Sequence, residues 1–274
     1  MTTETINGFR MYYEVHGSGH PFIWVHGGLG GGEGCDGFTK NHAQALSERF
    51  RLIFYDRRTA GRSESPTEGY SMTVFAEDVH ALLRHLGVNR AHLLGSSAGG
   101  PIATTYALEH PEMVSSLFLI NTMTYSSEPE RVARRKELDT ILAAEKAGGR
   151  EAGAEAAVLY RQPQVKAQDP ERFQRLYKIR LGNYEGVNRT MEAYLAVGDS
   201  IEKRLGELKM PVFIAHGDAD TTIPVRCGHD LHRGIPGSEL HIIPGAGHGL
   251  LTNEPELIRR LMLDFLERVP QPVG

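Results

Sequence analysis

The chain has 274 residues, of which 40% are hydrophobic and 23% are charged, and its formal net charge at pH 7 is −4. This length can bury a substantial core in one domain. The balanced charges form no basic stripe, which excludes nucleic acid as an expected partner. The N-terminus lacks a secretory pattern and no apolar run is long enough to span a bilayer, so we expect a cytoplasmic protein without a membrane partner.

The cysteine content indicates that neither a disulfide nor a metal organises the chain. The two cysteines, Cys35 and Cys227, lie far apart and have no metal-ligand spacing. We therefore expect two reduced thiols, no metal and no organic cofactor. The expected partner is a small-molecule substrate, and the composition gives no oligomeric state.

The first half of the chain alternates short apolar runs with segments of helical spacing. An alternating pattern predicts a hairpin over 6–15. Buried strands are expected over 21–25, 52–55, 91–94 and 114–120. Helices are expected over 42–49, 73–86 and 98–109. Apolar strands separated by helices are typical of a parallel sheet that is covered on both faces.

The second half interrupts this rhythm and then resumes it. Residues 123–208 are rich in Glu, Arg, Lys and Ala, show no strand pattern and are divided by prolines into several helices. After them we expect a strand over 212–215, a helix over 227–232, a strand over 240–243 and a helix over 254–268. The sequence thus predicts an α/β core over 1–122 and 209–274, with an inserted helical cap over 123–208.

A serine stands at the turn between the predicted strand 91–94 and the helix that follows it. The turn reads Gly95-Ser96-Ser97-Ala98-Gly99, which is a G-x-S-x-G pattern in the strand-turn-helix context of a nucleophile elbow. Such a turn strains the backbone of the nucleophile and requires small neighbours. Centring the pattern on Ser96 would put Leu94 and Ala98 at the glycine positions, so we assign Ser97 as the nucleophile.

A glycine-rich loop, His26 to Gly30, follows the strand at 21–25. Residues without side chains let backbone N–H groups approach a substrate oxygen. We expect the N–H groups of Gly28 and Ala98 to form an oxyanion hole.

The same loop contains a pattern that points to a different function. Gly32, Gly34 and Gly37 have the spacing G-x-G-x-x-G, and Asp56 follows about 20 residues later, as in a dinucleotide-binding fold. The first glycine of that fingerprint should stand at the strand end, but six residues intervene here. A dehydrogenase is therefore an alternative that we disfavour.

Two loops near the C-terminus supply candidates for a base and its acid. His248 ends a Gly-x-Gly-His stretch after the last predicted strand, and Asp218 and Asp220 follow the strand before it. A serine hydroxyl needs an adjacent imidazole as base, and the imidazole needs a carboxylate that fixes its tautomer. The chain order Ser, Asp, His is the one expected for this elbow. Either aspartate fits the loop.

These motifs together resemble the α/β-hydrolase family over nearly the whole chain, with similarity to its serine esterase and proline iminopeptidase branches. In that family the acid commonly lies four residues before a proline, as Asp220 does before Pro224, so the resemblance selects Asp220 over Asp218. The family also implies a structural turn made by four residues of the loop after the predicted strand 52–55. These are Asp56, Arg58, Gly61 and Ser63, with Thr59 in place of a usual glycine.

The resemblance implies cleavage of a carboxylic ester through an acyl-enzyme on Ser97, with His248 as base and Asp220 as acid. Proline iminopeptidases usually have H-G-G-P-G and G-G-S-W-G, from which Leu29 and the Ser96-Ser97-Ala98 stretch depart. Dehalogenases and epoxide hydrolases use an aspartate nucleophile and are disfavoured. Lactone, amide and carbon-carbon bond hydrolysis use similar sites and stay open, as does a non-catalytic small-molecule receptor.

Large side chains of the predicted cap are candidates for a substrate pocket or for packing between the cap helices. They are Tyr160, Phe173, Tyr177, Tyr184, Met191 and Tyr194. Glu185 or Glu192 could meet a cationic substrate or face water.

Overall fold

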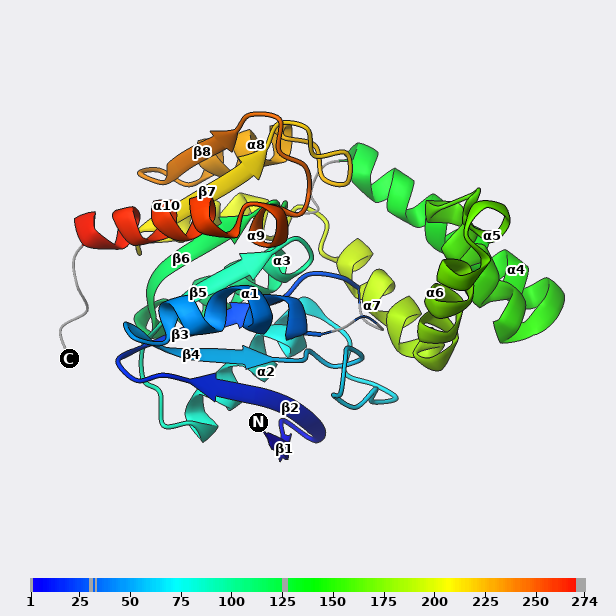
Figure 1. Ribbon diagram of the computed structural model, residues 1–274, viewed down its shortest axis with the longest axis horizontal. Coiled ribbons are helices and arrows are strands. Elements are labelled where there is room, and N and C mark those ends of the chain that lie inside the picture. The colour runs from blue at the N-terminus through cyan, green and yellow to red at the C-terminus, as the bar shows by residue number, and fades with distance from the viewer. Residues whose placement is uncertain (1, 30–31, 33, 125–127, 270–274) are drawn as a thin grey trace.

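The computed structural model describes residues 2–29, 32, 34–124 and 128–269. Within them one eight-stranded sheet has the order β1-β2-β4-β3-β5-β6-β7-β8 (Figure 1). β2 is antiparallel to both of its neighbours, and all the other pairs are parallel. The strands are β1 (Thr2–Ile6), β2 (Phe9–His16), β3 (His20–Val25), β4 (Phe50–Tyr55), β5 (Ala91–Ser96), β6 (Val114–Ile120), β7 (Val212–Gly217) and β8 (Glu239–Ile243).

Helices cover both faces of this sheet. Residues of α2, α3 and α8 join one hydrophobic cluster, and residues of α1, α9 and α10 join another. The helices are α1 (Asp36–Leu46), α2 (Met72–His85), α3 (Gly99–Glu109), α8 (Arg226–Gly234), α9 (Leu250–Asn253) and α10 (Pro255–Arg268). The predicted α/β class with a mostly parallel sheet is confirmed. The helix predicted over 42–49 is wrong at its start, because α1 begins six residues earlier.

Alternate residues of the central strands pack into different clusters. Ile23 and Val25 of β3 belong to the cluster with α2 and α3, whereas Phe22 and Trp24 belong to the cluster with α1 and α10. All four side chains are fully buried. Burial on both faces explains why these strands have continuous apolar runs rather than alternating polar residues.

The strand order places a crevice at the carboxyl end of β3. The chain passes from β3 to β4 on one side, but β5 pairs with β3 on the other side. The loops that follow β3 and β5 therefore diverge, and open α/β sheets bind ligands at such a point. These two loops carry Gly28 and Ser97.

The chain between β6 and β7 is helical in the part that the structure describes. It contains α4 (Glu128–Arg161), α5 (Val165–Gln168), α6 (Pro170–Gly182), α7 (Tyr184–Ala196) and the short 3-10 helix η2 (Glu202–Glu207). Non-helical angles at Gly148 and Gly149 break α4 into two helices. Figure 1 shows α4, α5 and α6 beyond the sheet, on the side toward which the parallel strands point. The division into a core and a cap stays a prediction.

Two features bear on the expected compartment. Cys35 and Cys227 are both buried and free. Among the described helices, none is both long enough and apolar enough to cross a bilayer.

Candidate active site

Ser97 lies at the turn between β5 and α3 with a backbone φ of +51°, a left-handed conformation that is uncommon for a residue with a Cβ. Glycines let the surrounding backbones approach closely. A Cβ on Gly99 would lie 2.1 Å from the carbonyl oxygen of Val25, and one on Gly95 would lie 2.7 Å from the Cα of Gly100. The glycines of the elbow motif are therefore required by contact with β3 and α3.

Three predicted side chains form one hydrogen-bonded chain. The Nε2 atom of His248 lies 3.0 Å from Oγ of Ser97, and its Nδ1 atom lies 2.8 Å from Oδ2 of Asp220. An ionised carboxylate only accepts hydrogen bonds, so Nδ1 carries the imidazole proton. The unprotonated Nε2 then faces the Ser97 hydroxyl, in the arrangement that lets an imidazole accept the hydroxyl proton.

The Asp220 carboxylate is buried and accepts four hydrogen bonds, one of which comes from the His248 ring. Oδ1 accepts from the backbone N–H groups of Thr222 and Ile223 at 2.8 and 2.9 Å, and Oδ2 accepts from Nδ2 of Asn121 at 2.6 Å as well as from His248. Burial raises the pKa of Asp220, but these hydrogen bonds outweigh it, so that the pKa lies below its ordinary value. The carboxylate is ionised at neutral pH.

The rival candidates have other partners. Oδ1 of Asp218 accepts from the backbone N–H of Gly245 at 2.7 Å, and the Asp218 residue is exposed. Ser96 is the last residue of β5 and pairs with Ile120 of β6. The structure thus brings Asp220 and Ser97 to His248, and gives Asp218 the role of closing a turn.

The orientation of the Gly28 N–H is set by groups that hold the preceding carbonyl. The Gly27 carbonyl accepts from Nδ1 of His26 at 2.8 Å and from Nη2 of Arg57 at 3.0 Å. His26 is protonated on Nδ1 because its Nε2 accepts the backbone N–H of Arg57 at 3.0 Å. Burial lowers the pKa of His26 to about 3, so the ring is neutral. Since C=O and N–H point in opposite directions across a trans peptide, this fixes the Gly28 N–H.

The Ala98 N–H is oriented in the same way. The Ser97 carbonyl, on the same peptide, accepts from Oγ1 of Thr122 at 2.5 Å and from the N–H of Gly100 at 3.0 Å. The hydroxyl of Tyr194, from α7, donates to the Ala98 carbonyl. The two N–H groups predicted for an oxyanion hole therefore belong to peptides whose carbonyls are held by buried donors. Gly30, also part of the predicted loop, lies outside the described residues.

The Asp56 carboxylate, which suggested a dinucleotide site, is occupied by the protein. It accepts from the N–H of Cys35 at 2.7 Å, and from the N–H and Nε of Arg62, both at 2.8 Å. Asp56 is fully buried, and a Cβ on Gly34 or Gly61 would collide with it. These hydrogen bonds join the loop before α1 to the loop after β4. They occupy both carboxylate oxygens of Asp56, so neither is available to a ribose.

The loop after β4 forms the turn that the family resemblance implies. The Oγ atom of Ser63 donates to the Asp56 carbonyl at 2.5 Å, and Arg58 makes a buried ion pair with Asp78 at 2.6 Å. Thr59 adopts a φ of +70°, a left-handed conformation that a glycine would adopt more readily. Its side chain approaches α7, where a Cβ on Gly186 would lie 2.4 Å from it.

Four residues of the site escaped the sequence analysis: Asn121, Thr122, Arg57 and His216. Asn121 donates to Asp220 and to the Gly247 carbonyl, and thereby links the acid loop to the histidine loop. His216 is buried with Nε2 3.6 Å from Oδ2 of Asp220. All four follow or end parallel strands, at the edge of the sheet where polar side chains gather. That position is a usable signal, but the residue types alone do not reveal partners.

The large side chains of 123–208 mostly pack against one another. Phe173 is buried and stacks on Tyr177 at 5.9 Å between ring centroids, and the Tyr184 hydroxyl donates to Glu145. Tyr194 reaches the elbow as described above, and Tyr160 is partly exposed. Of the six, Met191 lines the larger of the two cavities described next. Glu185 pairs with Arg150 at 2.8 Å, and Glu192 is exposed.

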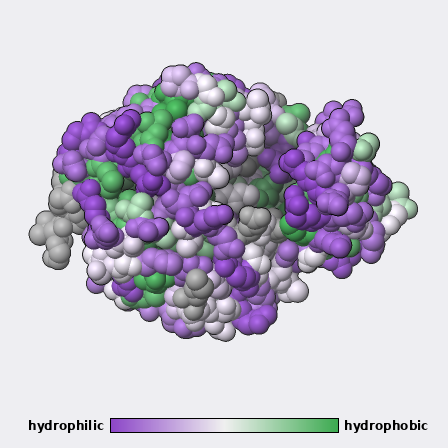
Figure 2. All heavy atoms as spheres, viewed as in Figure 1, coloured by the Kyte–Doolittle hydropathy of each residue, from purple (hydrophilic) through white to green (hydrophobic). Residues whose placement is uncertain are grey.

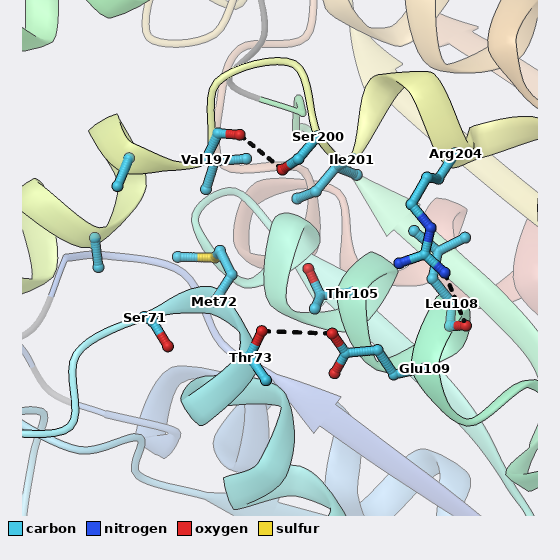
Figure 3. A pocket seen from close by; sticks show the side chains of 12 residues that line it. Ser71, Met72, Thr73, Thr105, Leu108, Glu109, Val197, Ser200, Ile201 and Arg204 are labelled. Carbon is cyan, nitrogen blue, oxygen red and sulfur yellow. Dashed lines mark hydrogen bonds between the residues drawn. The ribbon is translucent and has the colours of Figure 1, made fainter.

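Two cavities are lined in part by the helices between β6 and β7. One, of about 660 Å³, is lined by Leu29 and Gly32 of the loop after β3 and by residues of α4, α6 and α7. Figure 2 shows the surface hollowed between the core and the helices on the right, whose surface is mostly hydrophilic. The other cavity, of about 310 Å³, lies among α2, α3, α7 and η2 and holds a Thr73–Glu109 hydrogen bond of 3.5 Å (Figure 3). Its lining includes no residue of the Ser97, Asp220 or His248 loops.

Comparison with known proteins places this geometry in a family. A family model described as the alpha/beta hydrolase fold matches residues 20–141. Proteins from Caulobacter sp. (strain K31) and Variovorax paradoxus (strain S110), both with the provisional name carbamate hydrolase RutD, are 30% and 31% identical. They align with 97% and 96% of this chain and with 98% of their own lengths. The crystal structure of the enol-lactonase from Burkholderia xenovorans LB400 has a TM-score of 0.76 at 25% identity and covers 97% of this chain and 100% of its own. The chain belongs to the α/β-hydrolase family.

Proposed function

We propose that this protein is a serine hydrolase that cleaves carboxylic esters through an acyl-enzyme on Ser97. The observation that carries the proposal is the hydrogen-bonded chain from Asp220 through His248 to the Ser97 hydroxyl. A serine outside such a chain is a weak nucleophile at neutral pH. Support for Gly28 and Ala98 as an oxyanion hole comes from their neighbours: a Cβ on Gly27 would lie 2.9 Å from Cβ of Ser97, and Ala98 follows Ser97 in the chain.

The reaction runs in two steps. Oγ of Ser97 attacks the ester carbonyl while its proton moves to Nε2 of His248, and the carbonyl oxygen becomes an oxyanion held by the Gly28 and Ala98 N–H groups. The His248 proton then passes to the leaving alcohol oxygen as the carbon-oxygen bond breaks. Water attacks the acyl-enzyme, gives one proton to His248, and releases the acid while Ser97 recovers its proton.

A second candidate reaction is the hydrolysis of a carbamate, which the names of the relatives from Caulobacter and Variovorax suggest. A carbamate presents the same type of carbonyl to Ser97, and a lactone, as the name of the Burkholderia enzyme suggests, presents a cyclic ester. The two buried free thiols support the cytoplasmic location that forms part of the proposal.

The experiment is a substrate panel on the purified protein, with 4-nitrophenyl esters, lactones and N-alkyl carbamates at equal concentration. We expect turnover of esters that is lost in Ser97→Ala and kept in Ser96→Ala. Turnover of carbamates alone would replace the ester proposal by the second candidate. Tight binding of these compounds without turnover would make the protein a receptor and contradict the proposal.

A further inference from the structure

The lining of the cavity of about 660 Å³ includes residues that adjoin the proposed oxyanion hole. Leu29, which lines it, directly follows Gly28. Met191, which also lines it, lies one helical turn before Tyr194 on α7, and the Tyr194 hydroxyl reaches the Ala98 carbonyl. The cavity is therefore lined by residues that adjoin the groups of the proposed oxyanion hole.

The lining of this cavity combines apolar side chains with an excess of basic ones. The apolar residues are Leu29, Ala157, Val158, Leu176, Ile179, Val187 and Met191. The basic residues are Arg161, Arg172, Arg175 and Arg180, and the acidic residues are Glu137 and Asp169. The lining is thus basic in a chain whose formal net charge is −4.

The two acidic residues leave most of these cations uncompensated. Glu137 forms ion pairs with Arg134 and Arg161, at 2.5 and 2.6 Å. Asp169 is the N-cap of α6, because its Oδ1 accepts the backbone N–H of Arg172. Within the described part of the chain, no carboxylate forms an ion pair with the guanidinium of Arg172, Arg175 or Arg180.

Arg180 is the most buried of the three and is held in place by neutral groups. Its Nη1 donates to the Tyr184 carbonyl at 3.0 Å, its Nη2 donates to Oδ1 of Asn188, and the guanidinium lies 4.9 Å from the centre of the Tyr184 ring. Burial lowers the pKa of Arg180 to about 10, although the charges of Glu137 and Glu145 act in the opposite direction. An anionic group in the cavity would supply the missing charge.

We propose that this cavity binds the acyl part of the substrate, and that this acyl part is an apolar chain that ends in a carboxylate. The proposal rests on the proposed function. The leaving oxygen must lie within reach of His248, and no residue of the loops that carry Asp220 and His248 lines the cavity. The cavity therefore faces the other side of the scissile carbonyl, where Arg172, Arg175 and Arg180 meet the far end of the chain.

The test compares three esters of similar acyl length: mono(4-nitrophenyl) adipate, its methyl ester and 4-nitrophenyl hexanoate. We expect the wild-type kcat/KM for the carboxylate ester to exceed both neutral ones by about tenfold, since each exposed ion pair adds a few-fold. This advantage should shrink as salt is added. The double variant Arg172→Gln/Arg175→Gln should lose most of it while keeping its activity on the hexanoate.

Lys178→Gln is the matched control, because it removes an exposed cation from the same helix but from outside the cavity. It should keep the full preference. A wild-type kcat/KM that is equal for the three esters, or a preference that survives in the double variant, would overturn the inference while the ester hydrolase proposal stands.

A binding measurement separates the two proposals. Calorimetry on Ser97→Ala with monomethyl adipate and methyl hexanoate measures binding without any turnover. We expect the carboxylate compound to bind more tightly, and the double variant to abolish the difference. If no ester is turned over by the wild type, the proposed function fails, but this binding difference would still support the cavity, and equal binding would contradict it.

Discussion

The loops at the carboxyl edge of the sheet and the helices between β6 and β7 differ in how fully their polar groups are paired. Around Ser97, buried carbonyls and carboxylates each have two or more donors, as at Gly27, the Ser97 carbonyl and Asp220. On α6, Arg172 and Arg175 are exposed and have no carboxylate partner among the described residues. The first region is held rigid by its hydrogen bonds, whereas in our proposal the charges of the second are available to a ligand.

The largest expected effect comes from breaking the buried network at its acid. Asp220→Asn should lower kcat by about 10³- to 10⁴-fold, because the amide no longer holds the reactive imidazole tautomer or balances its charge. Asp218→Asn should change kcat by less than about fivefold, since the amide oxygen still accepts the Gly245 N–H in this exposed turn and only the charge is lost. Steady-state kinetics on both variants give the ranking, and the reverse order would move the acid role to Asp218.

A smaller effect should follow from loosening one oxyanion peptide. Thr122→Val keeps the side-chain shape but removes the hydroxyl that holds the Ser97 carbonyl. We expect kcat to fall by about tenfold with little change in KM, since the oxyanion forms only in the transition state.

Thr105→Val is the matched control for that variant. Its Oγ1 is buried on α3 and has no hydrogen-bond partner within the described structure. Removing it should leave kcat unchanged and cost no stability. Equal losses of kcat in the two variants would show that the Thr122 effect arises from packing rather than from the oxyanion peptide.

The smallest effect concerns the stability of the core rather than its chemistry. Burial lowers the pKa of His92 to about 3 and that of His42 to about 4. An unfolded histidine, with its ordinary pKa near 6.5, binds a proton before the folded one does. The stability contributed by the neutral buried rings is thus complete above about pH 6.5 and is lost as the pH falls toward the folded pKa values.

Chemical denaturation at pH 7 and pH 5 measures this loss. We expect the wild type to lose stability on acidification. The double variant His92→Phe/Ser116→Ala, which replaces both partners of a buried hydrogen bond, should lose about 1 to 2 kcal/mol less. An equal loss in the two proteins would mean that His92 is accessible to protons in the folded state.

The sequence allowed the core of the fold and the positions of the three candidate side chains to be predicted, because local signals carry them. Continuous apolar runs mark buried strands, and the glycines at 95 and 99 stand where backbones touch. The dinucleotide pattern correctly indicated that Gly34 and Asp56 lie together. Their contact, however, is a buried link between two loops and not a ligand site.

What escaped prediction depends on contacts between segments far apart in the chain. Thr122 and Asn121 act through Ser97 and Asp220, which lie 25 and 99 residues away in the sequence. Tyr194 was a candidate for a substrate pocket or for packing between the cap helices, whereas its hydroxyl binds the Ala98 carbonyl of the elbow. No spacing rule in one sequence links such partners, because their meeting depends on the position of β6 between β5 and β7 and, for Tyr194, on the packing of α7 on the core.

The most direct test of the account is to label the wild-type protein with a 4-nitrophenyl alkylphosphonate and locate the adduct by mass spectrometry. We predict one phosphonyl group per chain on Ser97, with parallel loss of ester hydrolysis, because its hydroxyl lies 3.0 Å from an imidazole that the Asp220 carboxylate holds on the other side. Ser97→Ala should take up no label. A stoichiometric adduct on Ser96 or on either cysteine, with Ser97 unmodified, would contradict the assignment of the nucleophile and the account built on it.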